Sequence, residues 1–355
     1  MDVSPRGLKI VTVAPLAVAK PFKPGPLIHF AAMLAYVIRR FFQSLIVLLI
    51  VMLFTFTLPY FQSGGILAPA YSVLGTHANP STVAHWGLVN GMDHPYFVRF
   101  KNFLDQVFLH FNLGHSYKQN LSVWNIISLY VPRTIWLALS SLIFTIIIGI
   151  PLGIYQASRR NTTFDYTATG FAFVLYAMPL FLLCLLMLQA FSFGWPHLPS
   201  SPPDGVAPWA IFTDPIGFIL PVACLTMVSV ATLSRFMRGT VLEVLVQDYV
   251  RTAKAKGCSG ARVLFRHAMR NALGPIVTIL GLSLPGLIGG ALIVESVFNY
   301  AGLGIQTVNA ATNVDIPTVL GITLLATILT LAGNFLADIM LGVVNPRIRI
   351  QGAAS

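Results

Sequence analysis

Apolar residues follow one another along this chain in long runs that no charged residue interrupts. Six such windows, each at least 20 residues long, cover residues 41–92, 134–158, 166–203, 215–234, 271–294 and 316–337. A bilayer core about 30 Å thick is crossed by ~20 apolar residues of α-helix. Each window holds one stretch of that size, so the pattern predicts an all-α membrane protein with six transmembrane helices. They are expected near residues 41–60, 133–155, 166–191, 215–236, 273–295 and 317–341.

The connections between the predicted spans also carry a pattern. Residues 296–314 lack charge, but Gly, Asn and Thr are too frequent there for a lipid-facing helix. The outer connection 61–132 is too long to be without structure. Apolar residues recur at helical spacing over 96–111, which predicts an amphipathic helix that either packs on the membrane or the spans, or docks an external partner. A second short helix is expected near 121–131, before Pro132 starts the next span.

The composition agrees with a membrane protein. Of the 355 residues, 56% are hydrophobic and 9% are charged, and the mean hydropathy is +0.77. A typical soluble domain is about 25% charged, so an ordinary cytosolic enzyme, a disordered chain and a secreted disulfide scaffold are excluded. Cys184, Cys224 and Cys258 fall in predicted spans or in a cytoplasmic loop. Neither a disulfide nor a metal site is expected from them.

Lys and Arg set the orientation. If the N-terminus is cytoplasmic, the outer segments carry only Arg99, Lys101, Lys118 and Arg133, and all other basic residues face the cytoplasm or its interface. The positive-inside rule therefore predicts that both termini are cytoplasmic. The net charge of +11 is mainly a topology signal, and a nucleic-acid partner is not predicted because no basic stripe lies on a soluble face.

Three regions are expected along the chain. Residues 1–32 are a flexible, Pro-rich cytoplasmic extension, and a signal peptide is disfavoured because Pro15 interrupts the apolar run and six spans follow. Residues 27–38, an apolar run of 12 residues that ends at Arg39 and Arg40, suit an interfacial helix that leads into the first span. Residues 33–350 form one transmembrane domain, and residues 351–355 are a tail.

Motifs for chemistry are missing from the sequence. It contains no G-x-x-x-x-G-K-[ST] loop for a nucleotide phosphate and no H-E-x-x-H metal motif. The histidines of the outer loops show no ligand spacing. The chain is therefore expected to be no enzyme and to hold no metal or cofactor of its own.

The cytoplasmic loop 235–272 predicts two helical segments separated by a break at 257–260. The first carries an apolar stripe of Val241, Leu242, Leu245, Tyr249 and Ala253, and the second carries Val263, Leu264, Ala268 and Ala272. Short helices of this kind need a partner to bury their apolar faces. An amphipathic hairpin lying on anionic lipid headgroups is an equal alternative at this point.

Particular residues of this loop resemble a known family. Residues 248–257, DYVRTAKAKG, followed by RHAMRNA at 266–272, resemble the cytoplasmic coupling loop of bacterial ABC importer permeases, and more narrowly the B-type subunit of the dipeptide/oligopeptide/nickel family. Where importers generally have E-A-A, this chain has RTA at 251–253, a departure common in the peptide subgroup. Further segments agree in order and spacing: MLAYVIRR at 33–40, NLGHS at 112–116, ESVFNYAGLG at 295–304 and NPRIR at 345–349.

The resemblance implies a type I ABC importer permease fold and a division of labour. Such a subunit pairs with a second homologous permease in the inner membrane, receives solute from an external substrate-binding protein, and is driven by P-loop ATPase subunits that bind ATP and Mg²⁺. The implied cargo is di- or oligopeptides, with nickel chelates or other small solutes as variants. The implied ATPase-coupling residues are Asp248, Tyr249, Arg251, Ala253, Lys254, Lys256 and Gly257, of which Gly257 permits the turn after the docking helix.

Interruptions in the fifth predicted span favour a translocation pathway. Gly and Pro free backbone groups that lipid cannot satisfy, so such a helix lines a water-filled path or packs on another helix. Glu295 is either an interfacial charge or a pathway residue, and Gln189 and Asn334 are suited to bond a neighbouring helix or a peptide backbone. The candidate pathway residues are Gln189, Gly281, Pro285, Gly289, Glu295 and Asn334. Gly149 and Gly153 form a G-x-x-x-G that predicts helix packing.

Two other classes of protein remain as alternatives. A self-sufficient secondary transporter or channel needs a mid-membrane acidic pair, a proton relay or a pore-lining ring, and none is visible in the sequence. A membrane scaffold that transports nothing is a weaker alternative. Only the importer permease requires the loop 248–272.

Overall fold

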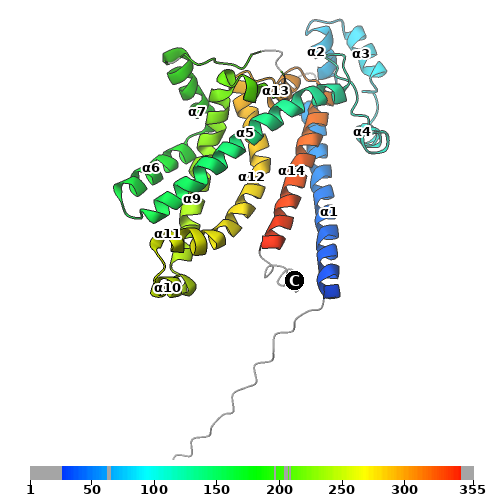
Figure 1. Cartoon of the computed structure of the whole chain (residues 1–355). Helices are drawn as coiled ribbons and strands as arrows, with labels where there is room; N and C mark the ends of the chain where they lie inside the picture. The colour runs from blue at the N-terminus through cyan, green and yellow to red at the C-terminus, as the bar shows by residue number, and fades with distance from the viewer. Residues whose placement is uncertain (1–25, 62–64, 196, 204–206, 208, 345–355) are drawn as a thin grey trace, which may run out of the picture.

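The computed structural model describes residues 26–61, 65–195, 197–203, 207 and 209–344 (Figure 1). Some side chains within these ranges lie outside the description, chiefly those of 26–37, 282–288 and 336–344. In the described part of the chain the regular elements are helices, and one isolated bridge joins His115 to Ser122. The predicted extension and tail lie outside the described residues, except that α1 already begins at Pro26 and runs without a break into the first span.

The long helices match the predicted spans in order. They are α1 (Pro26–Thr57), α5 (Val123–Ser158), α6 (Thr163–Ala177), α7 (Leu180–Met187) with η3 (Leu188–Gly194), α9 (Ile219–Leu245), α12 (Met269–Val297) and α14 (Ile316–Val344). Four of the described helices, in α1, α5, α9 and α14, are long and apolar enough to cross a membrane, and the bent α6–α7 pair makes a fifth candidate. The fifth predicted span, near 273–295, corresponds to α12, a continuous helix of 29 residues. The count of six spans stays a prediction.

The third predicted span is not one helix. Thr163–Ala177 and Leu180–Gly194 meet at 107°, so the continuous helix expected over 166–191 is wrong. Met178 adopts an extended backbone, with ψ at 128°, because the ring of Pro179 disfavours helical geometry in the residue before it. The apolar run is long enough for a span, and one proline divides it.

The second span extends further than predicted. α5 continues through Pro132, so the expected separate helix ending before this proline is wrong. Proline inside a membrane helix is tolerated where neighbouring segments satisfy the surrounding backbone. Here the Tyr300 hydroxyl donates to the Arg133 carbonyl oxygen (2.8 Å), and the Leu303 N–H donates to the Thr134 hydroxyl (2.8 Å). Tertiary contacts on the following turn therefore hold the helix.

The outer connection folds into short helices. They are η1 (Leu58–Phe61), η2 (Gly65–Leu67), α2 (Ala68–Leu74), α3 (Pro80–Val89) and α4 (Tyr96–His110). α4 confirms the predicted amphipathic helix, and its inner face packs on α1: the Phe56 ring lies 5.3–5.8 Å from the rings of Tyr96, Phe100 and Phe103. Of the two interpretations of this helix, packing on a span is therefore the one observed.

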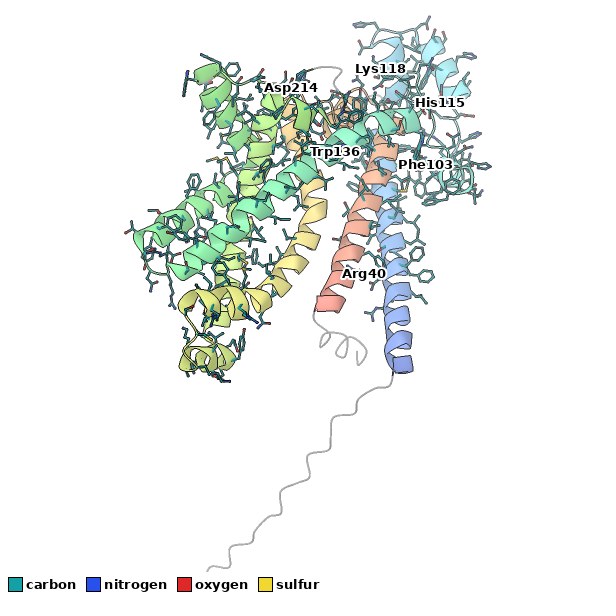
Figure 2. The ribbon with its side chains drawn as sticks, viewed as in Figure 1. Arg40, Phe103, His115, Lys118, Trp136 and Asp214 are labelled. Carbon is teal, nitrogen blue, oxygen red and sulfur yellow. The ribbon has the colours of Figure 1, made fainter. Side chains whose placement is uncertain are left out.

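The remaining short elements lie between the long helices. They are α8 (Ala210–Thr213), η4 (Ile216–Phe218), α10 (Asp248–Ala255), α11 (Gly260–Arg262), η5 (Val263–Ala268) and α13 (Leu303–Thr312). In Figure 1, α10 and α11 lie at the end of the molecule opposite to α2 and α3, and the start of α1 and the end of α14 lie toward the α10 end. Figure 2 shows Arg40 below His115, Lys118 and Asp214, which lie toward the α2–α3 end of the helices. The predicted orientation requires this arrangement, although which end faces the cytoplasm stays a prediction.

α5 and α9 make a close contact at two glycines. A Cβ atom at Gly153 would lie 2.5 Å from the Ser234 carbonyl oxygen and 2.6 Å from Met237 Cβ. A Cβ atom at Gly149 would lie 3.1 Å from the Leu233 side chain. The G-x-x-x-G of α5 thus faces α9 at a distance that only glycine permits at position 153.

Candidate functional site

The loop 235–272 contains the helix and the break that the sequence predicts. α10 starts after Gln247, whose backbone is extended and whose carbonyl oxygen accepts the Val250 N–H (3.0 Å). The helix ends at Ala255, and Gly257 then has a φ of +78°, a region that glycine adopts without strain. No other atom lies within 4 Å of the place where a Cβ at Gly257 would stand. The predicted turn at Gly257 is confirmed.

The apolar face of α10 differs from the predicted stripe. Val250 and Ala253 are buried and pack with Val263, whereas Tyr249 is 41% exposed and its hydroxyl accepts from the Asn271 amide (2.8 Å). The placement of Tyr249 on the apolar stripe is therefore wrong, and Val250 takes its position. The physical reason is the extended Gln247, which starts a new helix, so the helical period of α9 does not continue into α10.

The charged face of α10 points outward. Asp248, Arg251, Lys254 and Lys256 are exposed. Asp248 and Arg251 form an ion pair at 3.6 Å with side chains 98% and 74% exposed. Such an exposed pair contributes little to stability. These charges are therefore open to a partner at little cost to the fold.

The chain itself covers the apolar side of α10. Val244 and Leu245 at the end of α9 pack both on Val250 and Val263 and on a larger cluster above them. That cluster joins α5, α9 and α12 through residues that include Ile154, Met237, Val241, Ala272 and Ile276. The apolar face is thus not free to lie on lipid headgroups, which argues against the membrane-surface hairpin. A close-packed contact of this kind passes a displacement of α10 to the spans above it.

The candidate pathway residues are spread over three elements. Gln189 is exposed on η3, Gly281 is buried and Gly289 exposed on α12, and Asn334 is half-buried on α14. Pro285 also lies in α12, but its side chain is outside the described part. The described residues show no hydrogen bond that joins these positions, so their common role stays a prediction.

Glu295 lies inside the protein at the end of α12. Its carboxylate accepts hydrogen bonds from the Thr134 hydroxyl (2.6 Å) and from the backbone N–H groups of Gly304 and Ile305. These N–H groups form the first turn of α13, where the helix leaves them unpaired and a negative charge is favourable. A Cβ at Gly302 or Gly304 would collide with this carboxylate, which explains the glycines of the AGLG segment. Glu295 thus joins α12, α5 and α13.

A second buried carboxylate explains another motif. Ser116, in the NLGHS segment, donates to Asp315 directly before α14, and Asp315 also accepts from the Tyr117 N–H (2.9 Å) and the Thr318 hydroxyl (2.7 Å). Burial raises the pKa of the Tyr117 phenol, whose ring lies 5.1 Å from that of Trp86. This segment therefore fixes the outer connection to the start of α14. No local pattern in the sequence indicates this pairing, because about 200 residues separate the partners.

Together, the fold and the loop define a class of protein: the membrane subunit of an ABC transporter. A solved structure that shows inward-facing conformations of the MetNI methionine ABC transporter matches with a TM-score of 0.50. The match covers 62% of this chain and 97% of that chain at 18% sequence identity, so it speaks for the fold alone.

The sequence comparisons place the chain in one family. It belongs to the binding-protein-dependent transport system inner membrane components, whose family model matches residues 149–350 and whose N-terminal model matches residues 33–138. The oligopeptide transport system permease protein AppB of Bacillus subtilis is 33% identical, over 89% of this chain and 99% of AppB. The dipeptide transport system permease protein DppB of Escherichia coli is 36% identical, over 73% of this chain and 83% of DppB. The family resemblance noted in the sequence is confirmed.

Proposed function

We propose that this chain is the permease subunit of an ATP-driven ABC importer and carries di- or oligopeptides across the cytoplasmic membrane by alternating access. The observation that carries the proposal is α10, a short helix whose apolar face packs beneath the spans and whose charged face is open. The names of AppB and DppB support peptides as the class of solute. Separate P-loop subunits bind and hydrolyse ATP with Mg²⁺, and this chain hydrolyses nothing.

In this proposal α10 is where the ATPase subunits act. Their closure displaces α10, and the cluster around Val244 and Leu245 passes the movement to α5, α9 and α12. The residues that contact the ATPase are Asp248, Tyr249, Arg251, Lys254 and Lys256. Ala253 packs α10 against the rest of the chain, and Gly257 forms the turn that follows α10. The charged face favours a partner groove with complementary charges.

The solute path runs beside α12. Gly281, Pro285 and Gly289 lie within α12, which stays continuous through them. Gly and Pro at these positions are suited to a helix that lines a water-filled path. Gln189 and Asn334 offer amide groups that can bond the backbone of varied peptides. Glu295 takes part by fixing α13 to α12, because its carboxylate accepts hydrogen bonds from backbone N–H groups of the first turn of α13.

The assembly contains further partners. A second homologous permease completes the path, and an external substrate-binding protein docks at the end of the molecule that carries α2 and α3. The chain crosses the inner membrane several times, in contact with lipid, with both termini in the cytoplasm. The basic residues of the loops at the α10 end support this orientation.

Copurification and uptake test the proposal together. The chain is captured from native membranes in mild detergent, its partners are identified by mass spectrometry, and the complex is reconstituted to measure ATP-dependent uptake of a labelled dipeptide. A second permease, P-loop ATPases and uptake are expected. Lys254→Glu is expected to reduce ATPase capture, whereas the matched reversal Lys118→Glu at the outer end is expected to leave it intact. Purification as a lone chain or homo-oligomer would instead favour a secondary transporter or channel.

A further inference from the structure

An ion pair between a buried carboxylate and a partly exposed guanidinium joins α6 to α9. Arg238 donates from Nε to Asp165 Oδ1 (2.7 Å) and from Nη2 to Asp165 Oδ2 (2.8 Å). The Asp165 side chain is 1% exposed and also accepts the Asn161 N–H (3.0 Å). A guanidinium that binds both oxygens of a carboxylate fixes orientation as well as distance. The pair therefore sets how the first turn of α6 sits against α9.

A third helix, α5, also lies close to this pair. One turn earlier on α9, the Arg235 guanidinium lies over the rings of Phe173 and Tyr176 of α6, at 4.3 and 4.8 Å. On α5, a Cβ at Gly153 would lie 3.1 Å from the Arg238 backbone nitrogen. α9 thus contacts α6 through Arg235 and Arg238. The same part of α9 packs against Gly153 of α5.

Along α9, the pair lies next to the apolar cluster that connects α10 to the spans. The apolar cluster that connects α10 to the spans contains residues of α5, α9 and α12, but its described members include none from α6. α6 packs on α9 through Ala172, Leu175 and Ala231, further from α10. Nearer α10, the Asp165–Arg238 pair holds the first turn of α6 to α9, and Arg238 lies one turn before Val241 of the cluster.

We propose that Asp165 and Arg238 are positioning residues that make α6 and α7 follow the movement of α10 during transport. The inference rests on the proposed function, because it assumes that ATPase subunits move α10. A buried ion pair is a weak source of net stability, which is consistent with a role in fixing geometry. Without the pair, α9 moves with α10 while α6 lags behind, and ATP is hydrolysed without matching uptake.

Two neutral substitutions distinguish a role in coupling uptake to ATP hydrolysis from a contribution to stability alone. Asp165→Asn and Arg238→Gln are made singly and together in the complex, and melting temperature, ATP hydrolysis and peptide uptake are measured in proteoliposomes. Arg238→Gln leaves the buried Asp165 charge unpaired, and Asp165→Asn leaves the partly exposed Arg238 charge unpaired, so the melting temperature of each single variant is expected to fall. The double variant removes both charges and is expected to regain most of this loss. Its uptake per ATP hydrolysed is nevertheless expected to remain about fivefold or more below wild type, in the range of coupling between sites.

A distance measurement keeps the test informative if the double variant stays unstable. Spin labels are placed at exposed positions of α6 and α10, Tyr166→Cys and Ala255→Cys, with Cys258→Ser. The distance between them is expected to stay constant between nucleotide-free and ATP-trapped states in the wild-type background and to change in the double variant. A constant distance in both would overturn the inference.

The remaining outcomes distinguish the two proposals. Full uptake per ATP in the double variant, with normal coupling in wild type, would overturn this inference and leave the proposed function standing. Wild-type complexes that hydrolyse ATP without peptide uptake would contradict the proposed function and, with it, the inference. Asp105→Asn, which breaks the exposed pair with Lys101 on α4, is the control and is expected to change neither quantity.

Discussion

Two buried threonines of α5 differ in the hydrogen bonds that their hydroxyl groups form. The Thr134 hydroxyl donates to Glu295 and accepts the Leu303 N–H, so it joins α5 to both α12 and α13. The Thr145 hydroxyl, also on α5 and buried, has no hydrogen-bond partner among the described residues. The same residue type is therefore a cross-link at one position and an unpaired polar group at the other.

Valine substitution should separate the two threonines. Thr134→Val leaves the Leu303 N–H and one Glu295 oxygen without this partner, and an unsatisfied buried group costs about 1–3 kcal/mol. Thr145→Val removes an unpaired hydroxyl and should be neutral or slightly stabilising. Melting temperatures of the purified chain in one detergent provide the comparison. Equal losses for both variants would mean that the Thr134 contacts contribute no stability.

The turn after α10 depends on a single residue. Gly257 has a φ of +78° and its N–H donates to the Lys254 carbonyl oxygen (2.9 Å). Gly257→Ala should cost about 1 kcal/mol of backbone strain. Gly257→Pro fixes φ near −65° and removes the N–H, so the turn is lost. We expect Gly257→Pro to insert normally but to uncouple ATP hydrolysis from uptake.

The matched control for this turn is Gly260→Ala. Gly260 also has open space around it, but its φ is not positive. Uptake per ATP hydrolysed in proteoliposomes should be normal for Gly260→Ala and reduced for Gly257→Pro. Normal uptake by Gly257→Pro would remove this turn from the coupling mechanism.

At the scale of elements, close approach decides where helices meet. α5 and α9 touch through Gly153, which faces the backbone of Ser234 and Arg238, whereas Gly170 of α6 has no atom within 4 Å of a hypothetical Cβ. Backbone atoms cannot yield as a flexible side chain can. The two glycines therefore have different roles, although both lie within apolar helices.

Alanine substitutions should reveal this difference. Gly153→Ala forces α5 and α9 apart and should cost about 1–3 kcal/mol, typical of overpacking. Gly149→Ala meets only the Leu233 side chain and should cost less. Gly170→Ala should be neutral or stabilising by up to ~1 kcal/mol, since alanine favours helix. Yield and melting temperature in detergent measure the three; a stable Gly153→Ala variant would contradict the packing described here.

At the scale of the whole molecule, two groups of short helices lie at opposite ends. α10 and α11 lie at one end, and α2 and α3 lie at the other (Figure 1). The three cysteines are useful in this respect, because Cys184 and Cys224 are buried and only Cys258, next to the α10 turn, is partly exposed. The native sequence thus carries a reporter for the α10 end.

Thiol labelling should establish the orientation. A membrane-impermeant maleimide should label the chain at Cys258 in inverted vesicles and should leave intact cells unlabelled, if α10 faces the cytoplasm. Cys258→Ser should abolish the signal. In that background, His77→Cys, exposed between α2 and α3, should be labelled only from outside. The reverse pattern of labelling would overturn the proposed topology.

The loop around α10 shows that a helical period seen in the sequence does not always continue from one helix into the next. The break at 257–260 was predictable, because glycine is the residue that a positive φ requires. The buried face of α10 was not, since the extended Gln247 changes the helical phase and brings Val250 rather than Tyr249 inward. The division at Met178–Pro179 had a signal in the sequence, because a residue before proline avoids helical geometry, and the apolar run concealed it.

The sequence by itself determined the positions of the apolar helices and of the loop, and its motifs indicated the class of the protein through their resemblance to a known family. The positions of the helices and the turn depend on local properties: length, apolarity and the backbone preferences of Gly and Pro. The tertiary structure alone decided which polar groups meet. Asp165 finds Arg238 across 73 residues, and Glu295 finds Thr134 across 161. A buried charge must find a partner wherever the folded chain supplies one, and no local pattern records where that is.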